Sequence, residues 1–215
     1  MSTKLVLAST SAYRGALLRQ LGLEFNQIDP GVEETLVQRE SAAKRATRLA
    51  RHKASYGALK YLENTQDIND TGQANNGTTA SRIVIGSDQV AHLGNTILSK
   101  PGGFDPAFQQ LTQCAGRWVK FSTAICLVDG FGQVLAEGID TYEIKYRDLS
   151  VSEIQKYLQT EQPYDCAGSI MAEQRGIALI EKSKGRDITT LFGLPLILLT
   201  DLLIESGFSV INNFN

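Results

Sequence analysis

The chain has 215 residues, 42% of them hydrophobic and 20% charged, so it is long enough for one large domain or for two small lobes that share a cleft. Its formal net charge of -2 at pH 7 excludes a global positive field that would draw it to a nucleic acid polymer or to an acidic membrane surface. Any phosphate group that the protein binds must therefore be met by local lysine and arginine side chains.

The cysteine pattern and the apolar runs give an expectation for the cellular location of the protein. Cys114, Cys126 and Cys166 are widely spaced, and no pair has the spacing of a metal site or a redox motif, so reduced thiols are expected. The amino-terminal segment has no signal-peptide layout, and no run reaches the roughly 18 apolar residues of a membrane span. We expect a cytoplasmic protein with no membrane association.

The first part of the chain is predicted to start with a strand, a turn and a helix. "KLVLAST" is typical of a short buried strand that ends in a Ser/Thr turn, and a helical pattern follows from Ser11 to Gly22. A strand and a loop are predicted in "FNQIDPGVEET", and residues 40–62 have helical spacing. Segment 64–81 is almost wholly small and polar, which predicts a flexible loop without a catalytic role.

The second part mixes strands and helices without strict alternation. "IVIGSDQVAH", residues 83–92, is typical of a buried strand that ends at Asp88. Further strands are predicted in "VKFSTAICLVD", "VLAEGIDTYEIKYRDL" and "GIALIEKSKG", and helices in "PAFQQLTQCAG", "SVSEIQKYLQT" and "LPLILLTDLLIESG", the last with Pro195 in its first turn. This order favours a mixed α/β or α+β fold over a doubly wound sheet.

Two segments combine residues that suit phosphate chemistry. In "LASTSAYRGALL" a strand end, a helix start, Ser9, Ser11 and Arg14 fall together, which is a plausible seat for a phosphate. The alternative is that Ser9 or Ser11 simply caps the helix. Asp88 has apolar neighbours, and because a buried unpaired carboxylate is costly, it needs a metal, a cation or a reactive water. The alternative for Asp88 is an acid that caps a loop.

Three other charged residues are unremarkable alone. Glu34 lies in a loop beside Glu33, Lys53 in the middle of a helix, and Lys100 before a Pro-Gly-Gly turn. Each of these is usually a solvated surface charge.

Taken together, seven motifs occur in the order and approximate spacing of the Maf-like nucleotide pyrophosphatases. They are "LASTSAYRGALL", "EET", "RLARHKA", "GSDQV", "SKPGG", "CAG" at 166–168 and "GLPL" at 193–196. The resemblance covers nearly the whole chain, so residues 1–215 are expected to form a single Maf-like domain with two lobes around a cleft.

The resemblance implies a long twisted mixed sheet with flanking helices, similar to the inosine triphosphate pyrophosphatase fold. It also implies hydrolysis of a nucleoside triphosphate between the α and β phosphates with a divalent metal, Mg²⁺ or Mn²⁺, in a homodimer. By position, Asp88 resembles the catalytic acid of the family, and Glu34 and Asp88 would hold the metal. Ser9, Arg14, Lys53 and Lys100 would contact the phosphates.

Within the family, "SDQV" and "CAGS" followed by "AEQRGIALIE" resemble the branch associated with 7-methyl-GTP. The three positions linked there to substrate choice fall on Tyr13, Gln89 and Glu173. A methylated guanine is positively charged, which suits an aromatic face from Tyr13 and a carboxylate from Glu173. Gln89 could donate to or accept from the base or the sugar. The alternative is that Tyr13 packs beside its helix and Glu173 is surface charge.

The sequence departs from the family pattern at two positions. Ala12 stands where the family usually has proline, and Tyr13 stands where this branch often has tryptophan. A smaller ring is expected to stack less strongly on the base.

Two rival functions remain open at this point. One is the dTTP/UTP pyrophosphatase activity of the sister branch, and the other is a nucleotide-binding regulator of cell division without turnover. The joint presence of Asp88, Glu34, Lys53 and Lys100 favours an enzyme.

Overall fold

The computed structural model describes residues 4–35, 37–64 and 82–214. Residues 65–81, which make up nearly all of the predicted flexible loop, lie outside the described residues. The strands are β1 (Lys4–Ala8), β2 (Phe25–Ile28), β3 (Arg82–Leu93), β4 (Thr96–Leu98), β5 (Trp118–Asp129), β6 (Val134–Tyr146) and β7 (Ile180–Gly185). The helices are α1 (Ala12–Gln20), α2 (Ala42–Asn64), α4 (Phe104–Cys114), α5 (Val151–Glu161) and α6 (Leu196–Glu205).

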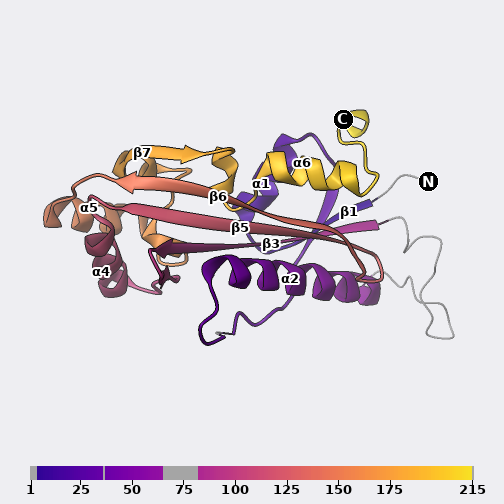
Figure 1. Cartoon of the computed structure of the whole chain (residues 1–215), viewed down its shortest axis with the longest axis horizontal. Helices are drawn as coiled ribbons and strands as arrows, with labels where there is room; N and C mark the ends of the chain where they lie inside the picture. Colours follow the sequence, from indigo (N-terminus) through magenta and orange to yellow (C-terminus); the bar gives the residue numbers. More distant parts are fainter. Residues whose placement is uncertain (1–3, 36, 65–81, 215) are drawn as a thin grey trace.

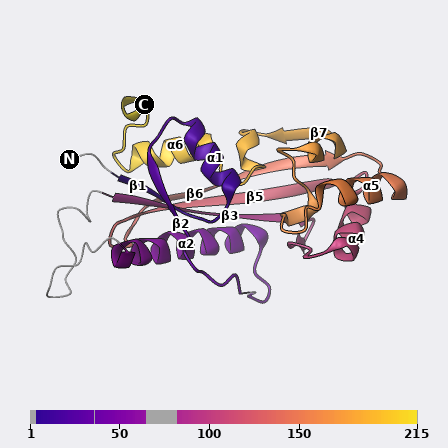
Figure 2. The same ribbon diagram turned by 180° about the vertical axis from the view of Figure 1, so that it is seen from behind.

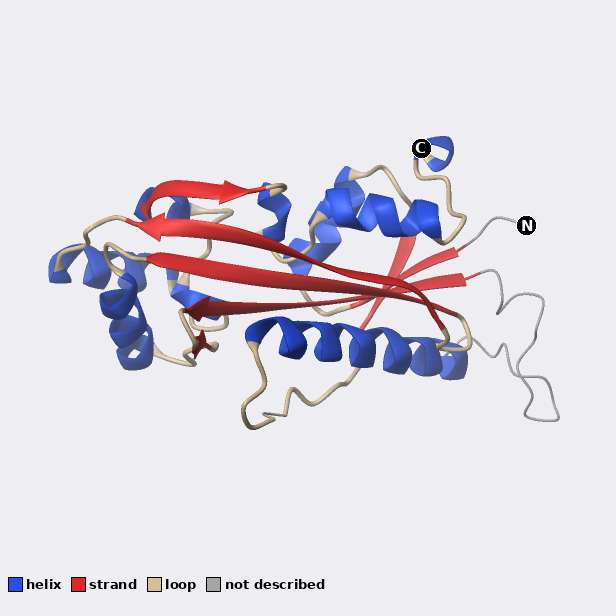
Figure 3. Ribbon diagram, viewed as in Figure 1, coloured by secondary structure: helices blue, strands red, loops and turns tan. Residues whose placement is uncertain are grey.

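The strands form one mixed sheet with the order β2-β1-β3-β5-β6-β7, and β4 pairs with β3. Strand β1 is parallel to both β2 and β3, whereas β5, β6 and β7 are antiparallel to their neighbours. Figure 3 shows that β3, β5 and β6 are long and twisted and run through most of the molecule. The prediction of a mixed α/β fold with a long twisted sheet is therefore confirmed.

Helices cover both faces of this sheet at its β1 end. Helix α2 lies along one face, and α1 and α6 lie along the other (Figures 1 and 2). The strands supply alternating side chains to the two layers: Val6 and Val84 pack in the α2 layer, and Leu7 and Ile85 in the opposite one. Helices α4 and α5 pack at the far end around a third apolar cluster that includes Phe121 and Tyr146.

Helix α2 lies unusually close to β3 because its inner face consists of small residues. Ala46, Ala50 and Ala54 recur every fourth residue and are fully buried against the sheet. The closest approach is at Gly86 in β3, where an added Cβ would collide with the Ala50 carbonyl oxygen and lie 2.5 Å from the Ala54 nitrogen. Glycine is required at residue 86 so that the helix backbone can rest on the strand.

Three sequence predictions about local structure are wrong in detail. Asp88 does not end its strand: β3 continues to Leu93, because β5 pairs with it along almost its whole length and places Ala124 opposite Asp88. The first part of "GIALIEKSKG" belongs to a 3-10 helix, Arg175–Leu179, before β7 begins. Pro195 is the N-cap of α6 and precedes its first turn.

None of the helices in the described ranges combines the length and the apolar content that a membrane crossing requires.

The contact at Gly86 makes a prediction about stability. Replacing Gly86 with Ala should lower the melting temperature by several degrees, since overpacking costs about 1–3 kcal/mol and each kcal/mol corresponds to about 2–4 °C in a domain of this size. The matched control is Gly103→Ala, where the backbone is extended and the added Cβ meets no atom within 4 Å. A thermal melt that shows equal shifts for the two variants would contradict this account of the helix-strand contact.

Candidate active site

A buried lysine joins two carboxylates where α2 crosses β3. The Nζ atom of Lys53 donates to Asp88 Oδ1 at 2.6 Å and to Glu34 Oε1 at 2.7 Å. Lys53 and Asp88 are 8% and 5% exposed, whereas the Glu34 side chain stands at the rim and is 36% exposed. The structure thus brings together three of the residues predicted for the site, from a helix, a strand and a loop.

The two carboxyl groups of this triad differ in acidity. Burial raises the pKa of Asp88, against the opposing charges of Lys53 and Arg14. Burial also disfavours the ionised form of Glu34, but the hydrogen bond and charge of Lys53, with smaller effects of Lys100 and Arg14, hold the pKa of Glu34 below its usual value. Asp88 is therefore the stronger base of the pair, and Glu34 stays ionised to a lower pH than Asp88 does.

Arg14 is held in place in the first turn of α1. Its Nε donates to the Gly193 carbonyl at 2.8 Å, and its Nη1 donates to Ser9 Oγ at 3.3 Å. Ser11 is the N-cap of α1 and accepts from the Arg14 backbone nitrogen at 3.4 Å. The capping alternative is thus correct for Ser11, while the buried Ser9 hydroxyl contacts Arg14.

The triad lies in a groove made of two adjoining cavities. The first has a volume of about 160 Å³ and extends from the triad to Tyr13, Glu173 and Phe192; we call it the Tyr13 cavity. The second, of about 170 Å³, extends to Arg45, Ile97 and Ser99; we call it the Arg45 cavity. Both cavities are lined by Glu34, Asp88, Gln89, Lys100 and Ala167, so the carboxylates lie where the two meet.

The Tyr13 cavity combines an aromatic ring with a carboxylate. The Tyr13 hydroxyl accepts a hydrogen bond from Gln174 Nε2 at 3.1 Å. Burial raises the pKa of Glu173, and burial together with the charge of Glu173 raises the pKa of Tyr13. Glu173 is thus a half-buried carboxylate in the groove, and a cation that entered beside Tyr13 would relieve the cost of its charge.

The Gln89 side chain is held by the protein itself. Its amide nitrogen donates to the Thr190 carbonyl at 2.7 Å, to the Leu191 carbonyl at 3.1 Å and to Thr123 Oγ1 at 3.1 Å. The sequence left open whether Gln89 donates a hydrogen bond to a ligand or accepts one. Its amide N–H groups already donate to the protein, which excludes donation to a ligand. Only the amide oxygen of Gln89 is available to accept from a ligand.

Two parts of this groove were not predicted from the sequence. The Gly193 carbonyl anchors both Arg14 and the Ser87 hydroxyl, although the sequence showed it only as part of a motif. Arg45 lines the second cavity, and the signal for it was its place four and eight residues before Leu49 and Lys53 on one face of α2.

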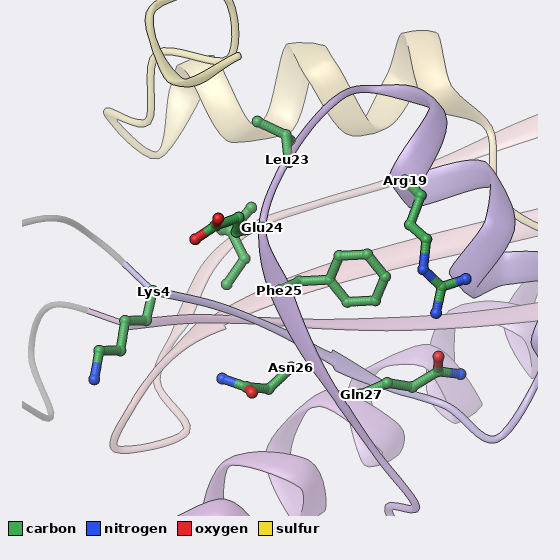
Figure 4. A pocket seen from close by; sticks show the side chains of 8 residues that line it. Lys4, Arg19, Leu23, Glu24, Phe25, Asn26 and Gln27 are labelled. Carbon is green, nitrogen blue, oxygen red and sulfur yellow. The ribbon is translucent and has the colours of Figure 1, made fainter. Parts of the chain in front are cut away.

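A larger cavity, of about 620 Å³, lies elsewhere, around edge strand β2. Figure 4 shows its lining side chains, with the Arg19 guanidinium beside the Phe25 ring. The charged residues that line it, Lys4, Arg19 and Glu24, are solvent-exposed. Neither Glu34 nor Asp88 lines this cavity. The greater volume of this cavity therefore does not make it the candidate active site.

The groove can be tested for its fit to a divalent metal. Among the described residues, no group of three or more His, Cys, Asp and Glu side chains could hold a metal ion. Glu34 and Asp88 each use one oxygen for Lys53 and leave the other open to the groove. Since Mg²⁺ is usually held by one or two carboxylates together with water and substrate phosphates, these two acids fit such an ion when a substrate is present.

Sequence similarity to known proteins identifies the family of this chain. The sequence model of the family described as "Maf-like protein" matches residues 4–206. The chain belongs to the Maf-like family.

Several relatives carry a more specific name. The protein named 7-methyl-GTP pyrophosphatase from Nitrosococcus oceani is 40% identical over 96% of this chain and 95% of its own length. Proteins of the same name from Pseudoalteromonas atlantica and Xanthomonas campestris are also 40% identical, over 93% and 98% of this chain and 93% and 100% of their own lengths. A solved nucleoside-triphosphatase / dITP/XTP pyrophosphatase from Mycobacterium abscessus is similar with 14% identity, a TM-score of 0.36 and coverage of 68% of this chain and 75% of its own.

The ion-pair triad makes a prediction about stability and its pH dependence. Lys53→Met should lower the free energy of unfolding at neutral pH by about 3 kcal/mol, because it leaves Asp88 buried and charged without its cation. The variant raises the folded-state pKa of both acids, so the lost stability should return as the pH falls and they become protonated.

Urea unfolding of the wild type and the variant over a pH series measures this difference. The double variant Lys53→Met, Asp88→Asn is the control, and it should recover much of the loss at neutral pH. A stability loss that stays constant from neutral to acid pH would contradict the assigned role of Lys53.

Proposed function

We propose that this protein is a nucleoside triphosphate pyrophosphatase that hydrolyses 7-methyl-GTP to 7-methyl-GMP and pyrophosphate. The observation that carries the proposal is the buried Asp88–Lys53–Glu34 triad in a groove that is also lined by the cations Arg14 and Lys100 and by Tyr13 and Glu173. The names of the relatives, which match over nearly the full length of both chains, support the same reaction.

In the proposed reaction Asp88 is the general base. The oxygen of a water molecule forms a bond to the α phosphorus, and the bond from that phosphorus to the α-β bridging oxygen breaks, so that pyrophosphate leaves. One proton of the water passes to the Asp88 carboxylate. Asp88 suits this step because burial raises its pKa and because its second oxygen is not bonded to Lys53. Lys53 fixes the orientation of the Asp88 carboxylate through its hydrogen bond to Oδ1.

Charge on the phosphates is offset by residues on three sides of the groove. Lys53 comes from α2, Arg14 from the first turn of α1, and Lys100 from the segment after β4. Fixed cations in such a groove stabilise charge that develops on phosphoryl oxygens. Ser9 contributes by holding the Arg14 guanidinium, since its hydroxyl accepts from Arg14 Nη1.

The proposed cofactor is Mg²⁺ or Mn²⁺, held by Glu34 and Asp88. When bound, such an ion neutralises phosphoryl oxygens and lowers the pKa of a coordinated water. Glu34 suits a ligand because its pKa is held low, so that it is ionised at neutral pH.

Base preference is assigned to the Tyr13 cavity. The face of Tyr13 and the carboxylate of Glu173 match the positive charge of a 7-methylguanine, and Gln89 can only accept a hydrogen bond there. A neutral thymine or uracil, the base of the rival dTTP/UTP activity, would leave the half-buried Glu173 without a cation. The homodimeric state and the cytoplasmic location expected from the sequence stay predictions.

A nucleotide panel tests the reaction. We expect metal-dependent release of pyrophosphate that is fastest from 7-methyl-GTP among 7-methyl-GTP, GTP, dTTP, UTP and CTP. Asp88→Asn should lower turnover by about 100-fold or more, as expected for loss of a general base, with little change in melting temperature because the amide keeps an acceptor for Lys53. Faster release from dTTP or UTP would overturn the substrate, and no release from any nucleotide would favour a non-catalytic regulator.

Removing the charge of Glu173 tests its assigned role in base preference. Glu173→Gln should reduce the preference for 7-methyl-GTP over GTP by about tenfold, the usual size of one hydrogen bond or contact to a charged group. An unchanged preference would contradict the assigned role of Glu173.

The pH profile of the same preference supplies an independent measurement. Glu173 must be ionised to attract the cationic base, and its pKa is raised. The preference should therefore fall as the pH drops through that raised pKa, at a higher pH than for an ordinary glutamate, and the Glu173→Gln variant should lack this dependence.

A further inference from the structure

The Arg45 guanidinium has a buried nitrogen without a partner. Its Nη1 atom is shielded from solvent and has no hydrogen-bond acceptor among the described residues. Burying a charged donor without an acceptor is expensive, and native proteins rarely keep such a group without a reason. The guanidinium group of Arg45 therefore has hydrogen-bonding capacity that the described residues do not use.

The nearby acid does not supply an acceptor for the Arg45 Nη1 atom. Glu40 is engaged by Arg48, whose Nε and Nη2 donate to its two carboxylate oxygens at 2.8 Å and 2.7 Å. Arg48 also donates to the Thr35 carbonyl at 3.2 Å. Two arginines three residues apart thus differ: Arg48 is paired with Glu40 and the Thr35 carbonyl, whereas the Arg45 Nη1 atom has no partner among the described residues.

Arg45 lines the groove at the end away from Tyr13. The Arg45 cavity also contains Lys100 and reaches the two carboxylates Glu34 and Asp88. Glu173 and Tyr13 line only the other cavity. Arg14 and Lys53 line that same cavity, whereas Glu34, Asp88 and Lys100 line both cavities. Arg45 is therefore the cation that the Arg45 cavity adds to those already around the triad.

We propose that Arg45 is a further substrate-binding residue, and that Arg45 and Lys100 hold the terminal phosphates, which leave as pyrophosphate. This inference rests on the proposed function and adds the direction in which the nucleotide lies in the groove. The base occupies the Tyr13 cavity, the scissile anhydride lies at Asp88 and Glu34, and the β and γ phosphates fill the Arg45 cavity. A guanidinium suits this task because it can donate two parallel hydrogen bonds to phosphate oxygens.

The assignment also predicts that Arg45 does not stabilise the free protein. Arg45→Met keeps a long apolar side chain next to Leu49 and Ile97 and removes the unpaired buried donor. Its melting temperature without ligand should equal or exceed that of the wild type. A drop of several degrees would assign Arg45 to the fold and overturn the proposal.

The ligand test is calorimetric binding of inorganic pyrophosphate, and separately of 7-methyl-GMP, each with Mg²⁺. Arg45→Met should weaken pyrophosphate binding by about tenfold or more and leave 7-methyl-GMP binding unchanged, because the monophosphate lacks the groups that Arg45 holds. The matched control is Lys44→Met, which removes the same charge from the neighbouring exposed position on α2 and should bind both ligands as the wild type does.

Each other result overturns the proposal. No binding of pyrophosphate to the wild type, equal losses in the Arg45 and Lys44 variants, or equal losses for both ligands would each exclude a terminal-phosphate site at Arg45. Since binding needs no turnover, these results are separate from a failure of the proposed function, which is seen as a wild type that hydrolyses no nucleotide.

Discussion

The ammonium group of Lys53 between two carboxylates is the interaction on which the rest of the site depends. Asp88 is 5% exposed and could not stay charged there without a cation in contact. That contact requires α2 to lie directly on β3, which in turn requires Gly86 and the row of alanines on the helix. The packing of the alanine face of α2 on β3 therefore also determines the environment, and so the acidity, of the Asp88 carboxyl group.

The groove carries charges of both signs that suit one kind of ligand. The half-buried Glu173 lies near Tyr13 in one cavity, which Arg14 and Lys53 also line, Lys100 lines both cavities, and Arg45 lines the other. A nucleotide with a cationic base and a polyanionic tail has groups that can pair with both signs of charge. The net charge of -2 of the whole chain is no obstacle, because the phosphates meet local cations.

Sequence patterns were sufficient for the features that depend on neighbours along the chain. The apolar residues around Asp88 predicted its burial, and the Ser/Thr turn before Arg14 predicted a helix start, which is now seen with Ser11 as its cap. The end of β3 was misplaced because the length of that strand is set by pairing with β5, in which Ala124, the partner of Asp88, lies 36 residues further along the chain.

Features that depend on long-range contacts could not be read in this way. The Lys53–Asp88 pair joins residues 35 apart, and Gln89 is held by carbonyls about a hundred residues further on. No local pattern shows that Lys53 is buried or that the Gln89 donor is occupied. The missing acceptor of Arg45 is visible only when the surroundings of each guanidinium nitrogen are known.

The most direct measurement is a crystal structure of the protein with Mn²⁺ and a 7-methyl-GTP analogue whose α-β bridging oxygen is replaced by a methylene group. The account predicts the base beside Tyr13 and Glu173, the α phosphate next to Asp88, the metal on Glu34 and Asp88, and the terminal phosphates between Arg45 and Lys100. A nucleotide bound in the cavity at β2, or bound in the groove with its phosphates toward Glu173, would contradict it.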